Sequence, residues 1–197
     1  MKRILSILML LIVTSGIVCA SGDFVVGEYS RPAGTGTRQW YYLVIQNNTD
    51  QTLDFSAAVK VYNSDGNIVG ARDSSEGPVS PGERAMLTYL FDEAFETAEH
   101  TLNAKGSRYS GVSQDLSYES FSAKNKEIIE VTNNGANVAR FVEVYVLFFD
   151  GDVVVSHDST YFVDDDSELK PGKSITKELD CYEDYDSFMV ILTGRAK

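Results

Sequence analysis

The residues of this 197-residue chain best suited to chemistry are aspartates gathered in loops of its C-terminal half. Hard carboxylate oxygens on loops are what calcium takes as ligands, about six to eight oxygens for each ion. No EF-hand spacing is present, and a run of charges is usually a solvated loop that keeps a β-protein soluble. The candidate calcium ligands are Asp150, Asp152, Asp164, Asp165 and Asp166.

Patterns typical of catalysis are weak in this sequence. SHDS at residues 156–159 contains the letters of a hydrolase triad, but neighbours along an extended chain point to opposite faces and cannot relay a proton. His100 has no cysteine or histidine at metal-ligand spacing, and GTGTRQW from Gly34 leads into a strand, whereas a phosphate loop needs helix amides. No pair of acids is marked out for glycoside hydrolysis. We therefore expect no enzyme, no catalytic residue and no cofactor other than calcium.

Aromatic residues form a second candidate site at Trp40, Tyr41 and Tyr42. Exposed rings can stack on sugars or anchor a protein partner. In a sandwich without disulfides, large rings more often fill the core, and this is the interpretation that we favour.

These candidate residues lie within a pattern of segments that occurs twice in the sequence. DFVVGEYS at residues 23–30 aligns with DLSYESFS at 115–122, and YYLVIQNN at 41–48 aligns with KEIIEVTNN at 126–134. Each copy continues with a strand into an Asp-Gly turn, a Pro-Gly pair and a last strand that reaches Gly106 or Gly194. The turns are Asp65-Gly66, Asp150-Gly151, Pro81-Gly82 and Pro171-Gly172. The shared order indicates a diverged duplication.

Each segment of the repeat is predicted to be a strand. Residues 55–62 alternate with period two, as a strand with one covered face does. Residues 142–149 are apolar on both faces toward their end, which predicts a central strand or a contact between domains. Only residues 92–100 could hold a short helix. The sequence predicts an all-β fold of two tandem immunoglobulin-like β-sandwich domains, residues 21–107 and 108–197, joined by the segment from Gly106.

The order of an asparagine pair, then VYNSDGNIVG or LFFDGDVVVS, then SPGE or KPGK, resembles the FxLYD-type and related immunoglobulin-like domains of bacterial envelope proteins. The resemblance covers nearly all of the chain after residue 20, although the turn of the first copy, at residues 62–66, is one residue longer than the compact form. Members of that family have no shared catalytic residues to carry over. The resemblance therefore implies a non-catalytic extracytoplasmic module.

The first 20 residues have the features of a secretory signal peptide. Lys2 and Arg3 precede an apolar stretch at residues 4–13, which is too short for a membrane span of about 20 residues. Val18 and Ala20 are small enough for cleavage after Ala20. The alternative is a lipid anchor on Cys19, although the preceding residues depart from a bacterial lipobox. We expect a secreted or extracytoplasmic protein, or alternatively one that is lipid-anchored to the cell membrane.

Charge and cysteine content narrow the choice of partner. The formal net charge of −12 repels nucleic acid and anionic membranes, so membrane contact is expected only through a lipid at Cys19. After cleavage only Cys181 remains, so the fold must rest on its core, and we expect this cysteine to be a small buried apolar residue rather than a reactive thiol. We expect a non-catalytic binding or spacer protein that contacts a protein or cell-envelope component through loops or edge strands. The alternative is calcium or carbohydrate recognition by the acidic loops of the second copy.

Overall fold

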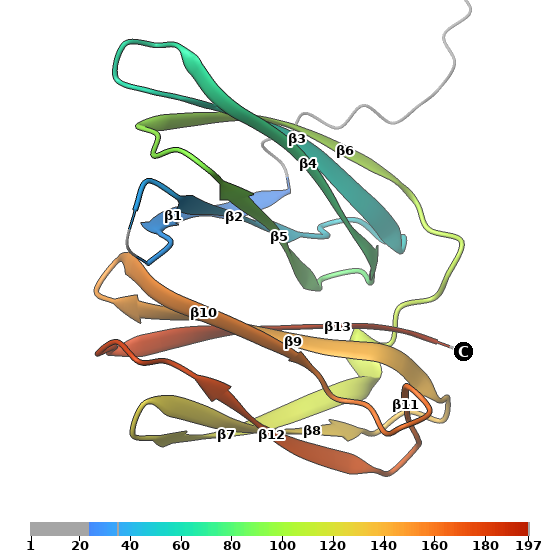
Figure 1. Ribbon diagram of the computed structural model, residues 1–197. Coiled ribbons are helices and arrows are strands. Elements are labelled where there is room, and N and C mark those ends of the chain that lie inside the picture. Colours follow the sequence, from blue (N-terminus) through green and yellow to red (C-terminus); the bar gives the residue numbers. More distant parts are fainter. Residues whose placement is uncertain (1–23, 35, 197) are drawn as a thin grey trace, which may run out of the picture.

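The computed structural model describes residues 24–34 and 36–196, and the predicted signal peptide and Cys19 lie outside them. The described chain is all-β, as the sequence predicts (Figure 1). The strands of the N-terminal half are β1 (Val25–Pro32), β2 (Gln39–Gln46), β3 (Leu53–Tyr62), β4 (Ile68–Val79), β5 (Arg84–Phe91) and β6 (Thr97–Gly106). The C-terminal half holds the 3-10 turn η2 (Ser113–Asp115) and the strands β7 (Leu116–Ala123), β8 (Lys126–Asn133), β9 (Ala139–Asp150), β10 (Val153–Tyr161), β11 (Glu168–Leu169), β12 (Ser174–Asp180) and β13 (Ser187–Ala196).

The helix expected within residues 92–100 is wrong. Residues 92–96 form bends, and β6 begins at Thr97. The amide of Phe95 donates to Oε1 of Gln39 at 3.0 Å, and the amide of Glu96 donates to the carbonyl of Tyr62 at 2.8 Å. These tertiary bonds hold the segment extended, because amides used between strands are not free to build a helical turn.

Antiparallel pairing gives two sheets in each half of the chain. The N-terminal half has the orders β1-β2-β5 and β4-β3-β6. The C-terminal half has the orders β7-β8-β12 and β10-β9-β13, with β11 paired to the first residues of β9. Strand for strand the second half repeats the first, and the acidic stretch at residues 162–167 divides β10 from β11 where β4 runs on unbroken.

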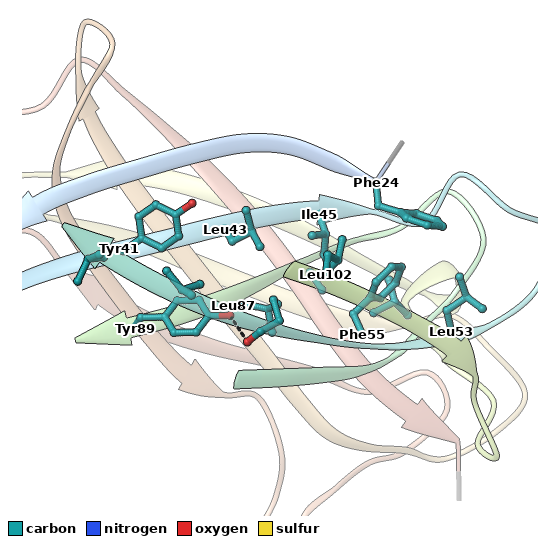
Figure 2. Packing of buried hydrophobic residues seen from close by; sticks show 14 of the residues in the cluster. Phe24, Tyr41, Leu43, Ile45, Leu53, Phe55, Leu87, Tyr89 and Leu102 are labelled. Atoms are coloured by element: carbon teal, nitrogen blue, oxygen red, sulfur yellow. Dashed lines mark hydrogen bonds between the residues drawn. The ribbon is translucent and has the colours of Figure 1, made fainter. Parts of the chain in front are cut away.

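The first core fills the space between the two N-terminal sheets, as in a β-sandwich (Figure 2). Tyr41, Leu43 and Ile45 project into it from alternate positions of β2. The hydroxyl of Tyr89 donates to the carbonyl of Ala57 at 3.0 Å, so this polar group has a hydrogen-bond partner inside the apolar core.

A second core fills the space between the two C-terminal sheets. Ile129 and Val131 of β8 pack there with Val144 and Val146 of β9. Cys181 belongs to this core and is fully buried, and burial raises the pKa of its thiol. The sequence-based expectation of a buried, apolar role for this cysteine is confirmed.

A third cluster joins the two halves face to face. Its buried members come from β2, β5, β9, β10 and β13: Tyr42, Val44, Met86, Leu147, Phe149, Val154 and Ile191. We call it the interface cluster. Strands β2 and β9 are therefore covered on both faces, with Tyr41 and Leu43 in one core and Tyr42 and Val44 in the interface cluster. Figure 1 shows the resulting stack of four sheets, from β3 at one side to β8 at the other. The run at residues 142–149 is apolar because β9 is both central and part of this contact.

Candidate functional site

The most promising site is a hollow at the seam where β4 of the N-terminal half meets β9, β10 and β13 of the C-terminal half. We call it the seam groove. One wall is formed by residues 76–78 of β4, and the other by Phe141, Glu143 and Tyr145 of β9, with Tyr161 and residues 193–195 closing it. Its volume is about 380 Å³. A second hollow of about 350 Å³ shares Glu76, Gly77 and Arg195 with it and continues along β3 and β6.

Two carboxylates from different halves of the chain line the seam groove. The amide of Gly77 donates to Oε1 of Glu76 at 3.2 Å. Burial raises the pKa of Glu76 to about 7, the Gly77 hydrogen bond opposes this, and the charge of Glu143 adds to it. The charge of Glu143 therefore makes ionisation of Glu76 more costly than burial alone would.

Glu143 is flanked by two phenol groups in the groove, those of Tyr145 and Tyr161. Burial is the main cause of the raised pKa of Tyr145, whereas the charge of Glu143 is the main cause of the raised pKa of Tyr161. Both phenols therefore stay protonated at neutral pH and are hydrogen-bond donors beside a carboxylate.

Arg195 lies at the rim of the groove between two aromatic rings. Its guanidinium carbon is 4.4 Å from the ring centroid of Phe141 and 4.8 Å from that of Tyr109. These distances are typical of cation–π contacts. Both rings are largely exposed, at 45% for Phe141 and 56% for Tyr109, so apolar surface is left open at the rim.

The backbone at Phe141 is unusual for a bulky residue. Its φ is +51°, in the left-handed region, and the pairing of β13 with β9 shifts register between Thr193 and Arg195, opposite this point. A β-bulge of this kind re-aims a side chain and is common beside binding sites. Across the groove, Gly77 is required because a Cβ there would lie 2.9 Å from Cα of Asp54.

The serine, histidine and aspartate at residues 156–159 do not form a catalytic triad. His157 turns into the interface cluster, where its Nδ1 lies 2.8 Å from the hydroxyl of Tyr42 and its ring centroid 4.6 Å from that of Trp40. Burial, and then the charge of Arg31, lower the pKa of His157 to about 4. Asp158 instead accepts from the amide of Asp180 at 2.8 Å. His157 is therefore an interface residue.

The five aspartates proposed as calcium ligands lie in two places. Asp150 and Asp152 flank the turn before β10, and the acidic loop at residues 164–166 follows its far end. Nine residues of extended strand separate the groups by roughly 30 Å. Asp166 pairs with Lys170 at 3.1 Å, and that hydrogen bond is the main cause that lowers the pKa of Asp166. The five do not form one site, and within residues 24–34 and 36–196 no three His, Cys, Asp or Glu residues are grouped to hold a metal.

The other candidates are structural in the described chain. Tyr41 and Tyr42 are buried and Trp40 packs on the interface cluster, so the interpretation that these rings are core residues is confirmed. His100 lies 3.7 Å from Oε1 of Glu28.

The chain matches no protein-family model and no curated protein. Within the described residues no helix has the length and apolarity to cross a membrane.

Sequence reasoning missed the seam groove. Glu76 and Glu143 are far apart in the chain and neither belongs to an acidic run. The one signal available was the expectation that residues 142–149 contact another domain, because Glu143 and Tyr145 lie within that run.

Proposed function

We propose that this chain is a non-catalytic extracytoplasmic binding protein, built from two immunoglobulin-like sandwiches, that holds part of a macromolecular partner in the seam groove. The observation that carries the proposal is that both halves contribute side chains to one groove. Open aromatic rings and two carboxylates converge there, as in sites where a few polar groups orient a ligand against apolar walls.

The face-to-face contact favours binding over a spacer role. A spacer gains length when its domains are joined end to end, whereas these halves bury sheet faces against each other through the interface cluster. The segment between β6 and η2 is also tied to both halves, since the amide of Ser107 donates to Thr52 and the amide of Ala196 donates to Ser110, each at 2.9 Å. Duplication in this arrangement creates a composite surface, and a fixed surface is what recognition requires.

The test is a screen of immobilised peptides and oligosaccharides with the purified protein and a groove variant carrying Phe141→Ala and Tyr161→Ala. We expect at least one probe to bind the wild-type protein and to lose at least tenfold in affinity with the groove variant. A control variant, Phe121→Ala on β7, removes an even more exposed ring elsewhere and should bind normally. The proposal is wrong if no probe binds, or if the groove variant binds every probe as the wild type does.

The carboxylate pair also supports a second candidate function, hydrolysis of a glycosidic bond. An acid whose pKa is raised to about 7 and that lies beside a second carboxylate is the arrangement of a general acid and its partner. The phenols of Tyr145 and Tyr161 beside Glu143 argue against it, because hydrogen-bond donors next to a carboxylate weaken it as a nucleophile. Turnover of aryl glycosides that disappears in Glu76→Gln would establish this function in place of simple binding.

A further inference from the structure

We propose that the seam groove binds the cationic side chain of a lysine or arginine presented by a partner protein. This inference rests on the proposed function and names the chemistry that the groove recognises.

Neither Glu76 nor Glu143 has a cationic partner in the described chain. Ion pairs there join Arg72 to Asp92, His100 to Glu28, Lys126 to Glu178, Arg140 to Glu168 and Lys170 to Asp166. None of them includes Glu76 or Glu143, although the pair sits in a partly buried hollow. Partly buried carboxylates are normally paired, so a positive group arriving from outside would relieve their mutual repulsion.

The cations that line the two hollows are not paired with these acids. Lys105 lines the adjoining hollow and Arg195 lines both, but neither is in the ion pairs of the described chain, and the guanidinium of Arg195 stacks on Phe141 and Tyr109. This contact also shows that the aromatic rim accepts a guanidinium. An incoming arginine or lysine would meet the same kind of ring surface on its way to the carboxylates.

The walls suit the remainder of such a side chain. Lysine and arginine carry a long apolar stem below the charge, and stems of this kind pack well along aromatic faces. Phe141 and Tyr161 are 45% and 49% exposed and stand on the C-terminal side of the groove, while Pro78 closes the other side. One extended side chain could therefore bury its stem among rings and place its charge between Glu76 and Glu143.

The charge of the whole chain acts in the same direction. The formal net charge is −12, which attracts basic partners and repels acidic ones before contact. Neutral sugars gain nothing from this field. The pairing of two acids with aromatic walls in an acidic protein therefore favours a basic peptide over an oligosaccharide.

The experiment is a titration of ¹⁵N-labelled protein followed by NMR. The probes are the peptide Ac-Gly-Gly-Lys-Gly-Gly-NH₂, the same peptide with the lysine acetylated, and chitotetraose. We expect the lysine peptide to shift the amide signals of Gly77, Phe141 and Gly194 with millimolar affinity, and the acetylated peptide to leave them in place. Glu143→Gln should weaken binding by about tenfold or more, because the variant removes a charge-assisted contact to the lysine ammonium.

Matched controls make the result decisive. Glu119→Gln on the outer strand β7 makes the same chemical change outside the groove and should leave the affinity unchanged. Unchanged signals outside the groove in Glu143→Gln show that this variant is folded. The inference is overturned if the acetylated peptide binds equally well, or if Glu143→Gln binds as tightly as the wild type. If chitotetraose alone shifts the groove signals, the inference is wrong while the proposed function stands. If no probe shifts these signals and the peptide and oligosaccharide screen finds no ligand, both the inference and the proposed function are wrong.

Discussion

Asn47 and Asn133 make the same set of hydrogen bonds in the two halves of the molecule. Nδ2 of Asn47 donates to the carbonyls of Gln51 at 2.7 Å and Val79 at 2.8 Å. Nδ2 of Asn133 donates to the carbonyls of Asn137 and Leu169, both at 2.8 Å. Each backbone carbonyl also accepts from a Pro-Gly turn, from Gly82 or Gly172, at 2.7 Å. Both side chains are fully buried, so each fixes where its loop leaves the sheet.

Replacing either asparagine by alanine should destabilise the protein by about 1–3 kcal/mol. Asn47→Ala removes the side-chain donor to the buried carbonyl of Val79, and Asn133→Ala removes the donor to that of Leu169. Urea unfolding of the two variants measures the loss. Asn134→Ala is the control, because Asn134 is exposed and its side chain donates to the hydroxyl of Ser117 at 2.8 Å, whereas its backbone bond to Asp115 is kept in the variant. A loss below 0.5 kcal/mol in the buried variants, on the order of the surface effect, would contradict the role given to them.

Much of the fold could be predicted from the sequence because its signals are local. The Asn-Asn, Asp-Gly and Pro-Gly landmarks mark the ends of strands by their turn chemistry, and period two marks the covered faces. The short helix expected at residues 92–100 is wrong, because the tertiary hydrogen bonds of Phe95 and Glu96 override the helix propensity there.

The candidate site could not be predicted, because it depends on how two sheets meet. Glu76 and Glu143 become neighbours only when the two halves pack together, and no local sequence pattern indicates how the two sheets are placed against each other. The conspicuous aspartates misled for the opposite reason: residues close in sequence, such as Asp152 and Asp164, are carried apart by the strand between them. Local clustering of charge is therefore a weaker guide to a site here than the two-sided apolar strand β9.

His157 should make the protein less stable in mild acid. Its pKa is lowered to about 4, first by burial and then by Arg31, with Asp158 opposing, so the unfolded chain binds a proton near pH 6.5 and the folded chain does not. Stability from this group is fully present above pH 6.5 and falls as the pH falls toward 4. We expect wild type to lose about 1–2 kcal/mol more than His157→Gln between pH 7 and pH 4 in urea unfolding.

Tyr42→Phe separates this titration from the loss of a hydrogen bond. The variant removes the hydroxyl 2.8 Å from Nδ1 of His157 but leaves the imidazole buried, so it should be less stable at all pH values with the slope of the wild type. Equal slopes for wild type and His157→Gln would show that another group causes the acid sensitivity.

Glu76 should have the opposite pH dependence. Because burial raises its pKa to about 7, the folded chain holds a proton that the unfolded chain releases near pH 4.5, and stability falls as the pH rises through this range. The charged and titratable groups that line the two hollows with it are Asp54, Lys105, Tyr109, Glu143, Tyr145, Tyr161 and Arg195. Glu76→Gln should therefore match wild type at pH 4 and be about 1–2 kcal/mol more stable at pH 8. Glu119→Gln should change neither value, and a Glu76→Gln variant that is less stable at pH 8 would contradict the assignment.

Phe141 should be a position where glycine is better than alanine. Its φ of +51° costs an L-residue about 1 kcal/mol and costs glycine nothing, so Phe141→Gly should be about 1 kcal/mol more stable than Phe141→Ala, although both lose the ring that stacks on Arg195. Phe121 provides the control, because it is 60% exposed in an ordinary stretch of β7, where glycine weakens a strand. There the order should reverse, with Phe121→Gly less stable than Phe121→Ala. Urea unfolding of the four variants tests both pairs, and the same order at both positions would mean that the bulge at Phe141 is not held in the left-handed conformation in solution. If the orders differ as expected, the bulge at Phe141 keeps a strained backbone in solution, and this strain places an aromatic ring over Arg195 at the rim of the seam groove.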